Sequence, residues 1–271
     1  MAITGAGGGL GGELARKLRA EGANVALLDL RPDIVNELAE ELGGARFARG
    51  WSVDVRDLAA LEAVMDEVAE HFGGIDVVVA AAGVLGALQT IEPTPADDWD
   101  RVIDVNLNGL WRTMKVAAPH VRASQGHMVA LSSMIAYIHP PLLGSYAASK
   151  AGVAAFIDVL RLEMRASGVT VGSVHPAIFR TPMIGDALES PAGVELVNDF
   201  TGVFETTELE TVVDEIVKGI EKRSKRVVVP RKLRFAAFMP GAVQAIIERL
   251  EFRPKSVARA IELGSEPGVS S

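Results

Sequence analysis

Two side chains that can share a proton stand one helical turn apart in this sequence. Tyr146 and Lys150 are four residues apart, so a helix through both places the ammonium close to the phenol. A phenol with a reference pKa near 10 serves as a base at neutral pH only if that pKa falls by about 3 pH units, or about 4 kcal/mol. A neighbouring ammonium can supply much of that change. A lysine lying beside a half-buried structural tyrosine has the same spacing.

Two further polar residues can join this pair. Ser133 ends an apolar run thirteen residues before Tyr146, and the proline- and glycine-containing loop between them allows the two hydroxyls to meet on one substrate oxygen. Asn106 interrupts an apolar helical stripe, so its amide is expected to be buried and must find hydrogen-bond partners. A buried asparagine of this kind is usually structural, and here it has a possible second role.

A glycine-rich turn near the N-terminus is a candidate phosphate site. The segment TGAGGGLG, Thr4 to Gly11, follows a short apolar run and leads into a helical stripe of leucines. Glycines let backbone amides approach a pyrophosphate, and the N-terminus of the following helix attracts its charge. Two registers of the glycine pattern fit, and glycines also cluster in turns that bind nothing.

Asp29 adds to this signal because it ends the second apolar run, 18 residues past Gly11. A carboxylate there can accept hydrogen bonds from the hydroxyls of an adenosine ribose, which favours NAD over NADP. A 2′-phosphate would meet like charge, although Arg31 partly offsets it. The alternative interpretation is a carboxylate that only caps the turn before Pro32.

Short apolar runs alternate with helical stripes through most of the chain. Strands are expected at Ala2–Thr4, Val25–Leu30, Phe47–Val55, Ile75–Ala80, His127–Ser132 and Val169–Val174, with helices after the glycine turn, over Ile34–Leu42, after the capping residue Asp57, over Trp99–Met114 and from about Tyr146. This alternation predicts an α/β fold with a doubly wound, Rossmann-like parallel sheet and helices on both faces, which binds ligands beyond the carboxyl ends of its strands. We expect one domain over residues 1–230 and a helical C-terminal extension over 231–271.

Composition excludes several classes of function. The 271 residues include 35 acidic and 27 basic side chains, and the net charge of −8 argues against a nucleic-acid partner. The absence of cysteine excludes disulfides, thiolate nucleophiles and thiolate-bound metals. The five histidines show no H-E-x-x-H spacing and no serine lies in G-x-S-x-G, so neither a metal site nor a serine hydrolase is expected.

No targeting segment is expected, because the chain passes from its first residues directly into glycines and then charges. Residues 123–149 carry no charge and are long enough to span a bilayer, but their prolines, histidines and serines indicate strand and loop. We therefore expect a cytoplasmic protein without membrane association.

Together these motifs resemble those of the classical short-chain dehydrogenase/reductases. The resemblance rests on TGAGGGLG, Asp29, Asp54, AAAG at 80–83, Asn106, Ser133, YAASK at 146–150 and HPAIFRTPM from His175, and it covers about residues 1–230. It selects the TGxxxGxG register, through Gly5, Gly9 and Gly11. It implies one dinucleotide-binding and catalytic domain that transfers hydride between nicotinamide and a secondary alcohol or ketone.

The resemblance also implies a role for each matched residue. Tyr146 would be the general acid/base, Ser133 would orient the substrate oxygen, and Lys150 would hold the nicotinamide ribose and lower the tyrosine pKa. Asn106 would anchor a water in a proton relay. The residues expected to contact the cofactor are Gly5, Gly9, Leu10, Gly11, Asp29, Asp54, Val55, Gly83, Tyr146, Lys150, Pro176, Ile178 and Thr181.

Three departures from the family pattern are visible. Ala81 stands where the family usually has an asparagine that braces the sheet, and Ala177 replaces the glycine after Pro176. The first strand has only about three residues before Gly5, so we expect the native start to lie upstream or to have been cut away.

The remaining segments bear on substrate and partners. Residues 183–205 mix glycine and proline with apolar side chains, which is typical of a mobile lid over a lipophilic substrate. After Pro230, an apolar stripe is expected to pack on the body or on another subunit of a homo-oligomer, a dimer or tetramer. The stripe consists of Val243, Ile246, Ile247 and Leu250, and it is preceded by Phe235, Phe238 and Met239. A pocket cover and, through the neighbouring basic residues, a membrane surface are the alternatives.

The leading hypothesis is an NAD-dependent oxidoreductase acting on a secondary alcohol or the matching ketone. One alternative is an NADP-linked 3-oxoacyl thioester reductase, which cofactor preference would distinguish. Another is a catalytically inactive nucleotide-sensing protein of the same fold, which a fully active Tyr146→Phe protein would favour.

Overall fold

The computed structural model describes residues 1–179, 185, 190–198, 206–250 and 254–265. Its centre is a parallel sheet of seven strands in the order β3-β2-β1-β4-β5-β6-β7. The strands are β1 Ala2–Thr4, β2 Val25–Asp29, β3 Ala48–Ser52, β4 Val77–Ala80, β5 His127–Leu131, β6 Thr170–Pro176 and β7 Arg226–Val229. The sequence predicts the first six, and the structure adds β7 at one edge.

The order of the strands reverses at β1, which pairs with β2 on one side and with β4 on the other. Thr4 lies opposite Leu28 in one pair and opposite Ala80 in the other. At this switch point the chains leaving β1 and β4 diverge, which is where doubly wound sheets bind ligands. Gly5 turns there with φ 73°, and a Cβ atom on it would lie 2.7 Å from the backbone of Ala82. Only glycine allows this close approach.

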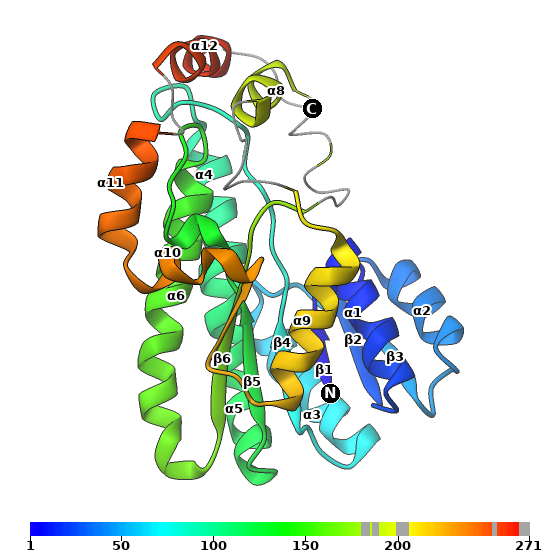
Figure 1. Ribbon diagram of the computed structural model, residues 1–271. Coiled ribbons are helices and arrows are strands. Elements are labelled where there is room, and N and C mark those ends of the chain that lie inside the picture. The colour runs from blue at the N-terminus through cyan, green and yellow to red at the C-terminus, as the bar shows by residue number, and fades with distance from the viewer. Residues whose placement is uncertain (180–184, 186–189, 199–205, 251–253, 266–271) are drawn as a thin grey trace.

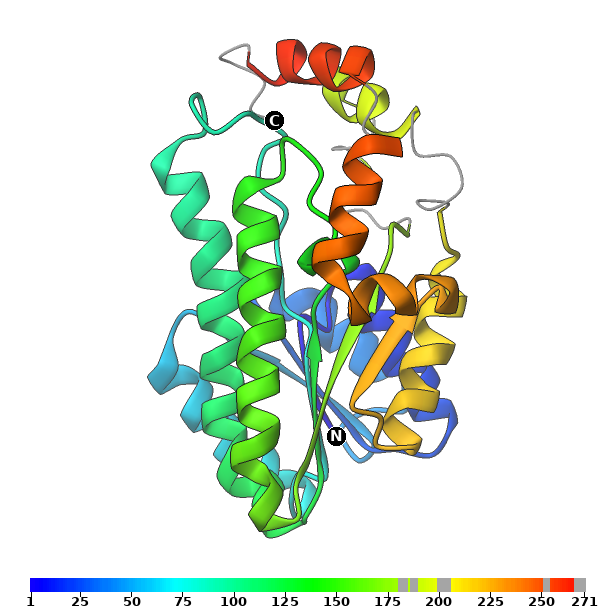
Figure 2. The ribbon, with the colours of Figure 1, turned by 60° about the vertical axis from the view of Figure 1, so that its left-hand side comes forward.

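Helices cover both faces of the sheet (Figures 1 and 2). One face carries α1 Gly9–Ala20, α2 Pro32–Glu41 and α9 Leu209–Glu221, and the other carries α3 Leu58–Phe72, α4 Ala96–Ile103, α5 Leu110–Ala123 and α6 Gly144–Met164. Alternate strand residues point to opposite faces, so Leu27 joins the first core and Leu28 the second. The Asp57 side chain caps α3 as predicted, because its Oδ1 accepts from the Ala60 N–H at 3.0 Å.

The long helix predicted over Trp99–Met114 is interrupted. A π-helical turn, Asp104–Gly109, separates α4 from α5 and contains the buried Asn106. Gly109 packs against Val55, which follows β3. A Cβ atom on Gly109 would lie 2.6 Å from Val55 Cγ2. Such turns insert one extra residue into a helix and occur often at functional sites.

The C-terminal extension is helical, and only one side of its first half is buried. It comprises a 3₁₀ turn Arg231–Leu233, α10 Arg234–Phe238, α11 Pro240–Leu250 and α12 Pro254–Gly264. Leu233 and Ala237 are buried with Tyr137, whereas Phe235 and Phe238 are 61% and 81% exposed. Further along, α12 lies beside α8 Pro191–Asn198, beyond the carboxyl ends of the strands (Figures 1 and 2).

In the part of the chain that the structure describes, no helix is both long and apolar enough to cross a bilayer. The charge-free stretch 123–149 consists of the end of α5, the strand β5, a loop and the start of α6. Of the predicted lid, 183–205, the structure describes residues 185 and 190–198, where α8 lies, and the rest falls outside the described residues.

Acid is expected to destabilise the fold partly through His127. This side chain is buried at the start of β5, with Nδ1 2.8 Å from Thr170 Oγ1, and burial lowers its pKa to about 4. Between pH 6.5 and 4 the unfolded chain therefore binds a proton that the folded chain does not. The free energy of unfolding should fall by about 3 kcal/mol over this window on account of His127.

Urea unfolding at both pH values measures this contribution. His127→Asn keeps a polar partner for Thr170 and should remove about 3 kcal/mol of the pH dependence. The same substitution at the exposed His139 is the matched control. An unchanged pH dependence in His127→Asn would contradict the prediction.

Candidate active site

A cavity of about 700 Å³ opens at the carboxyl ends of the central strands. Most residues that the sequence singles out line it together, although they come from seven separate segments. They are Gly5, Gly9, Leu10, Gly11, Asp29, Asp54, Val55, Gly83, Ser133, Tyr146, Lys150, Pro176 and Ile178. Asn106 is buried behind the wall, and Thr181 lies outside the described residues.

The glycine turn presents a helix N-terminus to this cavity. The cap of α1 is Gly8, which has extended backbone and, among the described residues, no side chain to cap the helix. Gly11 packs so tightly that a Cβ atom on it would lie 2.2 Å from the Gly5 carbonyl oxygen. The N–H groups of the first helical turn are therefore available to an anion, and the helix dipole favours negative charge there. This arrangement suits a pyrophosphate.

Asp29 is held at the end of β2 by three donors. Its Oδ2 accepts from the Gly7 N–H at 3.0 Å, and its Oδ1 accepts from the Arg31 backbone N–H at 3.1 Å and from Arg31 Nε at 3.2 Å. Arg31 also donates to the Gly7 carbonyl at 2.8 Å. The carboxylate thus borders the cavity in a fixed position next to the glycine turn, and the guanidinium beside it is already paired.

Asp54 and Val55 follow β3 at the same end of the sheet. Arg56 donates to both carboxylate oxygens of Asp54. Its Nη2 donates to Oδ2 at 2.7 Å, and its Nε donates to Oδ2 at 3.0 Å and to Oδ1 at 3.1 Å. This pairing holds the pKa of the Asp54 carboxyl below its usual range. The ion pair and the buried Val55 line the cavity where the chain leaves β3.

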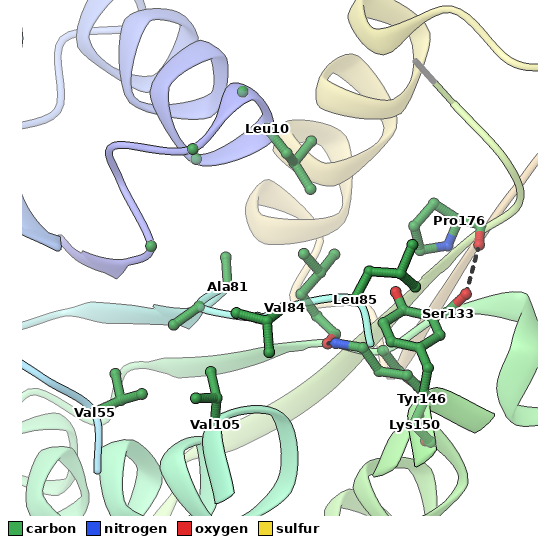
Figure 3. A pocket seen from close by; sticks show the side chains of 18 of the residues that line it. Leu10, Val55, Ala81, Val84, Leu85, Val105, Ser133, Tyr146, Lys150 and Pro176 are labelled. Atoms are coloured by element: carbon green, nitrogen blue, oxygen red, sulfur yellow. Dashed lines mark hydrogen bonds between the residues drawn. The ribbon is translucent and has the colours of Figure 1, made fainter. Parts of the chain in front are cut away.

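Ser133, Tyr146 and Lys150 gather at the other end of the cavity (Figure 3). Ser133 follows β5, where its Oγ accepts from the Ile135 N–H at 3.2 Å and lies within hydrogen-bonding reach of the Tyr146 hydroxyl. Lys150 lies one turn further along α6, with Nζ donating to the Leu131 carbonyl at 3.0 Å and 5.5 Å from the centre of the tyrosine ring. The structure therefore brings the three side chains together, as the sequence predicts.

Burial determines the charge state of this group. It raises the pKa of Tyr146 to about 12, although the hydrogen bond with Ser133 acts in the opposite direction. It also lowers the pKa of Lys150 to about 8. The expectation that the ammonium lowers the tyrosine pKa is therefore not met in the chain alone, because removing both groups from water disfavours both charged forms.

Asn106 braces the cavity wall from behind. Its Oδ1 accepts from the Val84 N–H at 2.8 Å, and its Nδ2 donates to the Val84 carbonyl at 2.9 Å and to Ser149 Oγ at 3.2 Å. Each polar group of the amide is thus engaged with the segment that follows β4 or with α6. The π-helical turn is what brings this side chain to both.

Thr4 fixes the neighbouring residues of the same segment. Its carbonyl accepts from the Ala81 N–H at 3.2 Å, and its Oγ1 accepts from the Ala82 N–H at 3.4 Å. Ala81, which stands where an asparagine is usual, lines the cavity without a polar side chain. Thr4 therefore holds the AAAG segment through the backbone of Ala81 and Ala82, and Asn106 holds the next residue, Val84, in the same way.

The sequence interpretation missed the apolar wall around the three polar side chains. The described part of this wall includes Val84, Leu85, Leu88, Met134, Ile135, Pro140 and Leu143. Figure 3 shows Leu85 and Pro176 beside Ser133 and Tyr146, and Val84 closer to Val55. These residues lie in the two connections that leave the carboxyl ends of β4 and β5, so their place in those connections is the signal that would have identified them.

Comparison with known proteins gives consistent matches. The family model described as short chain dehydrogenase matches residues 1–191. A (-)-trans-carveol dehydrogenase of Rhodococcus erythropolis is 36% identical over 198 residues, covering 67% of this chain and 71% of that protein. A 2-dehydro-3-deoxy-L-rhamnonate dehydrogenase (NAD(+)) of Sphingomonas sp. is 33% identical over 189 residues, covering 69% and 75%.

A solved structure of a short-chain type dehydrogenase/reductase from Mycobacterium ulcerans has a TM-score of 0.75 at 26% identity, over 84% of this chain and 86% of that chain. The family model ends before α9, so it does not extend to the C-terminal extension.

Replacing Asn106 is expected to weaken the fold. Asn106→Ala leaves the N–H and carbonyl of Val84 without their partners, and each unsatisfied buried group costs about 1 to 3 kcal/mol. We expect the free energy of unfolding, measured by urea denaturation, to fall by about 3 kcal/mol. Asn108→Ala, at an exposed position two residues away, is the matched control. Equal stability of the two variants would show that the brace is unimportant.

Proposed function

This chain belongs to the short-chain dehydrogenase family, and on that basis we propose that it is an NAD-dependent oxidoreductase acting on secondary alcohols or ketones. The observation that carries the proposal is the shared cavity. One end has an uncapped helix N-terminus and a carboxylate, and the other has two hydroxyls and an amine. A dinucleotide has the two kinds of group that such a cavity would hold, a pyrophosphate for the helix N-terminus and a reacting ring for the end with the hydroxyls.

The residues present fit a dinucleotide. Backbone amides at the start of α1 would hold the pyrophosphate, Asp29 would accept from the adenosine ribose, and Lys150 would hold the nicotinamide ribose. When bound, the dinucleotide would supply the hydride acceptor or donor and, in its oxidised form, a positive charge. The charges near Asp29 favour NAD over NADP. The 2′-phosphate of NADP would meet the Asp29 carboxylate, and the guanidinium of Arg31 is already engaged by Asp29 and the Gly7 carbonyl.

Tyr146 and Ser133 would act on the substrate oxygen. Both hydroxyls face the cavity, so both can bond to one oxygen. Tyr146 would give its proton to the forming alkoxide in reduction, and in oxidation its deprotonated form, the phenolate, would accept the alcohol proton. With a pKa of about 12 the phenol holds its proton at neutral pH. Lys150 would stabilise the phenolate when the lysine itself carries a positive charge. With a pKa of about 8, the amine is charged below about pH 8.

The apolar wall around these hydroxyls supports a lipophilic substrate. Leu85, Met134, Ile135 and Leu143 surround the place where the carbon skeleton must lie. Burying such a skeleton is favourable by about 25 cal/mol for each Å² of apolar surface removed from water.

We also propose a homo-oligomer. Trp111 on α5 and Val159 and Leu162 on α6 are large apolar side chains that remain exposed in the single chain. Their helices lie side by side on one flank of the molecule (Figures 1 and 2), which would provide a continuous contact for a second copy.

Removing the phenolic hydroxyl tests the proposed chemistry. Tyr146→Phe should lower kcat by about 10² to 10⁴, because general acid/base catalysis contributes about that much, while Kd for NADH should stay within about twofold. The chain has two tyrosines, and Tyr137→Phe is the matched control. A screen of secondary alcohols and ketones, followed at the nicotinamide absorbance, provides the substrate. Full activity of Tyr146→Phe would instead favour the nucleotide-sensing alternative.

Cofactor preference tests the proposed role of Asp29. Titration should show NADH binding about tenfold or more tightly than NADPH, since a 2′-phosphate would meet the carboxylate. Asp29→Ser should reduce this preference by about tenfold, and Asp33→Ser, at an exposed carboxylate on α2, should not. A parent protein that prefers NADPH would overturn the assignment and favour the thioester reductase.

A further inference from the structure

Leu142 has a backbone conformation that a leucine rarely adopts. Its φ is 69°, in the left-handed region, and its side chain is buried. Residues in such conformations persist where the surrounding structure determines them, and they concentrate near functional sites. Leu142 precedes Leu143, which lines the cavity, and lies in the loop that joins Ser133 to Tyr146.

A second loop pairs with this strained segment. The Gln89 N–H donates to the Leu142 carbonyl at 3.2 Å, and Gln89 forms an isolated parallel bridge with Leu143. Next to it, Leu88 lines the cavity. The two loops therefore form one piece of wall at the substrate end, with Leu88 and Leu143 as its inner surface.

The C-terminal helix α12 holds the outer surface of that wall. The Gly264 carbonyl accepts from the Thr90 N–H at 3.2 Å, and the hydroxyls of Thr90 and Ser265 lie 3.2 Å apart. Gly264 also packs against the strained residue, because a Cβ atom on it would lie 2.8 Å from Leu142 Cδ2 and 3.3 Å from the Leu88 carbonyl oxygen. A side chain at 264 would therefore force the Leu142 side chain to shift and would press on the backbone of Leu88.

Two further contacts tie the extension to the same region. Leu142 is buried in a small cluster with Ala260 of α12 and Ala192 of α8. On α11, Gln244 Oε1 accepts from the His139 N–H at 3.0 Å, one residue before Pro140, which lines the cavity. The extension therefore contacts both loops that form the wall.

We propose that α12, through Gly264, determines the size of substrate that the cavity accepts. It does so by fixing the positions of Leu88 and Leu143 from outside the cavity. This inference rests on the proposed function, since it concerns the alcohol or ketone that occupies the same cavity.

The kinetic test compares two identical substitutions in the extension. Gly264→Val should push the wall inward, whereas Gly241→Val adds its side chain to open space on α11, where a Cβ atom has no neighbour within 4 Å. The substrates are a graded series of secondary alcohols, from 2-propanol through 2-octanol to a substituted cyclohexanol. We expect kcat/KM for the bulkiest active alcohol, relative to the smallest, to fall by about tenfold or more in Gly264→Val only. The Kd for NADH should stay within about twofold.

Hydrogen exchange tests the same clamp without turnover. The amides of Gln89 and Thr90 donate the bonds described above, so they should exchange about fivefold or more faster in Gly264→Val than in Gly241→Val. Unchanged exchange, or an unchanged size preference in an active enzyme, would overturn the proposal. A parent protein that turns over no alcohol or ketone, with exchange still faster in Gly264→Val, would refute the proposed function and support the clamp.

A second variant keeps the test valid if valine at 264 prevents folding. Leu142→Gly retains the left-handed backbone, which glycine adopts freely, and removes the side chain between α12 and the wall. Relative to the smallest alcohol, kcat/KM for the bulkiest should rise by about fivefold or more. A proportional change for all substrates would count against the proposal.

Discussion

The parallel pairing of β1 with both β2 and β4 is the constraint on which the rest of the molecule depends. It forces the chain to leave two adjacent strands in different directions, and the space between them is the start of the cavity. It also brings the glycine turn within contact of the backbone after β4, which Thr4 and Asn106 then hold by hydrogen bonds to main-chain groups. The glycine turn and the segment that follows β4 are therefore positioned largely through backbone contacts.

Desolvation shifts the pKa values of the two titrating groups of the site, Tyr146 and Lys150, in opposite directions. The same burial that keeps the Tyr146 phenol protonated favours the neutral amine of Lys150, so the chain alone disfavours the charged form of each. The geometry of the helix and the burial of the site thus determine different properties of this pair of side chains. The helix places the two groups one turn apart, while water exclusion decides what charge they carry. A charge brought by a ligand would act strongly in such surroundings, because little solvent is present to screen it.

The sequence predicts the alternating architecture, six strands and the capping role of Asp57, because local periodicity and turn chemistry encode them. It fails for β7, a four-residue run too short to carry a periodic signal. It fails also for the π-helical turn, which depends on the packing of Gly109 against Val55. Polar site residues could be named in advance because their chemistry is distinctive. The leucines of the wall could not, since they resemble any core residue, and the direction of the Tyr146 pKa required knowing its burial.

The described contacts of the extension lie at one end of the cavity. The end with the glycine turn is made by segments from the first half of the chain, whereas the wall around Ser133 and Tyr146 is supported by helices that come last in the sequence. Under the proposed function, selectivity and redox chemistry would be separable in evolution. Drift in the final helices would then change which molecules are admitted, while the residues that handle electrons are inherited intact.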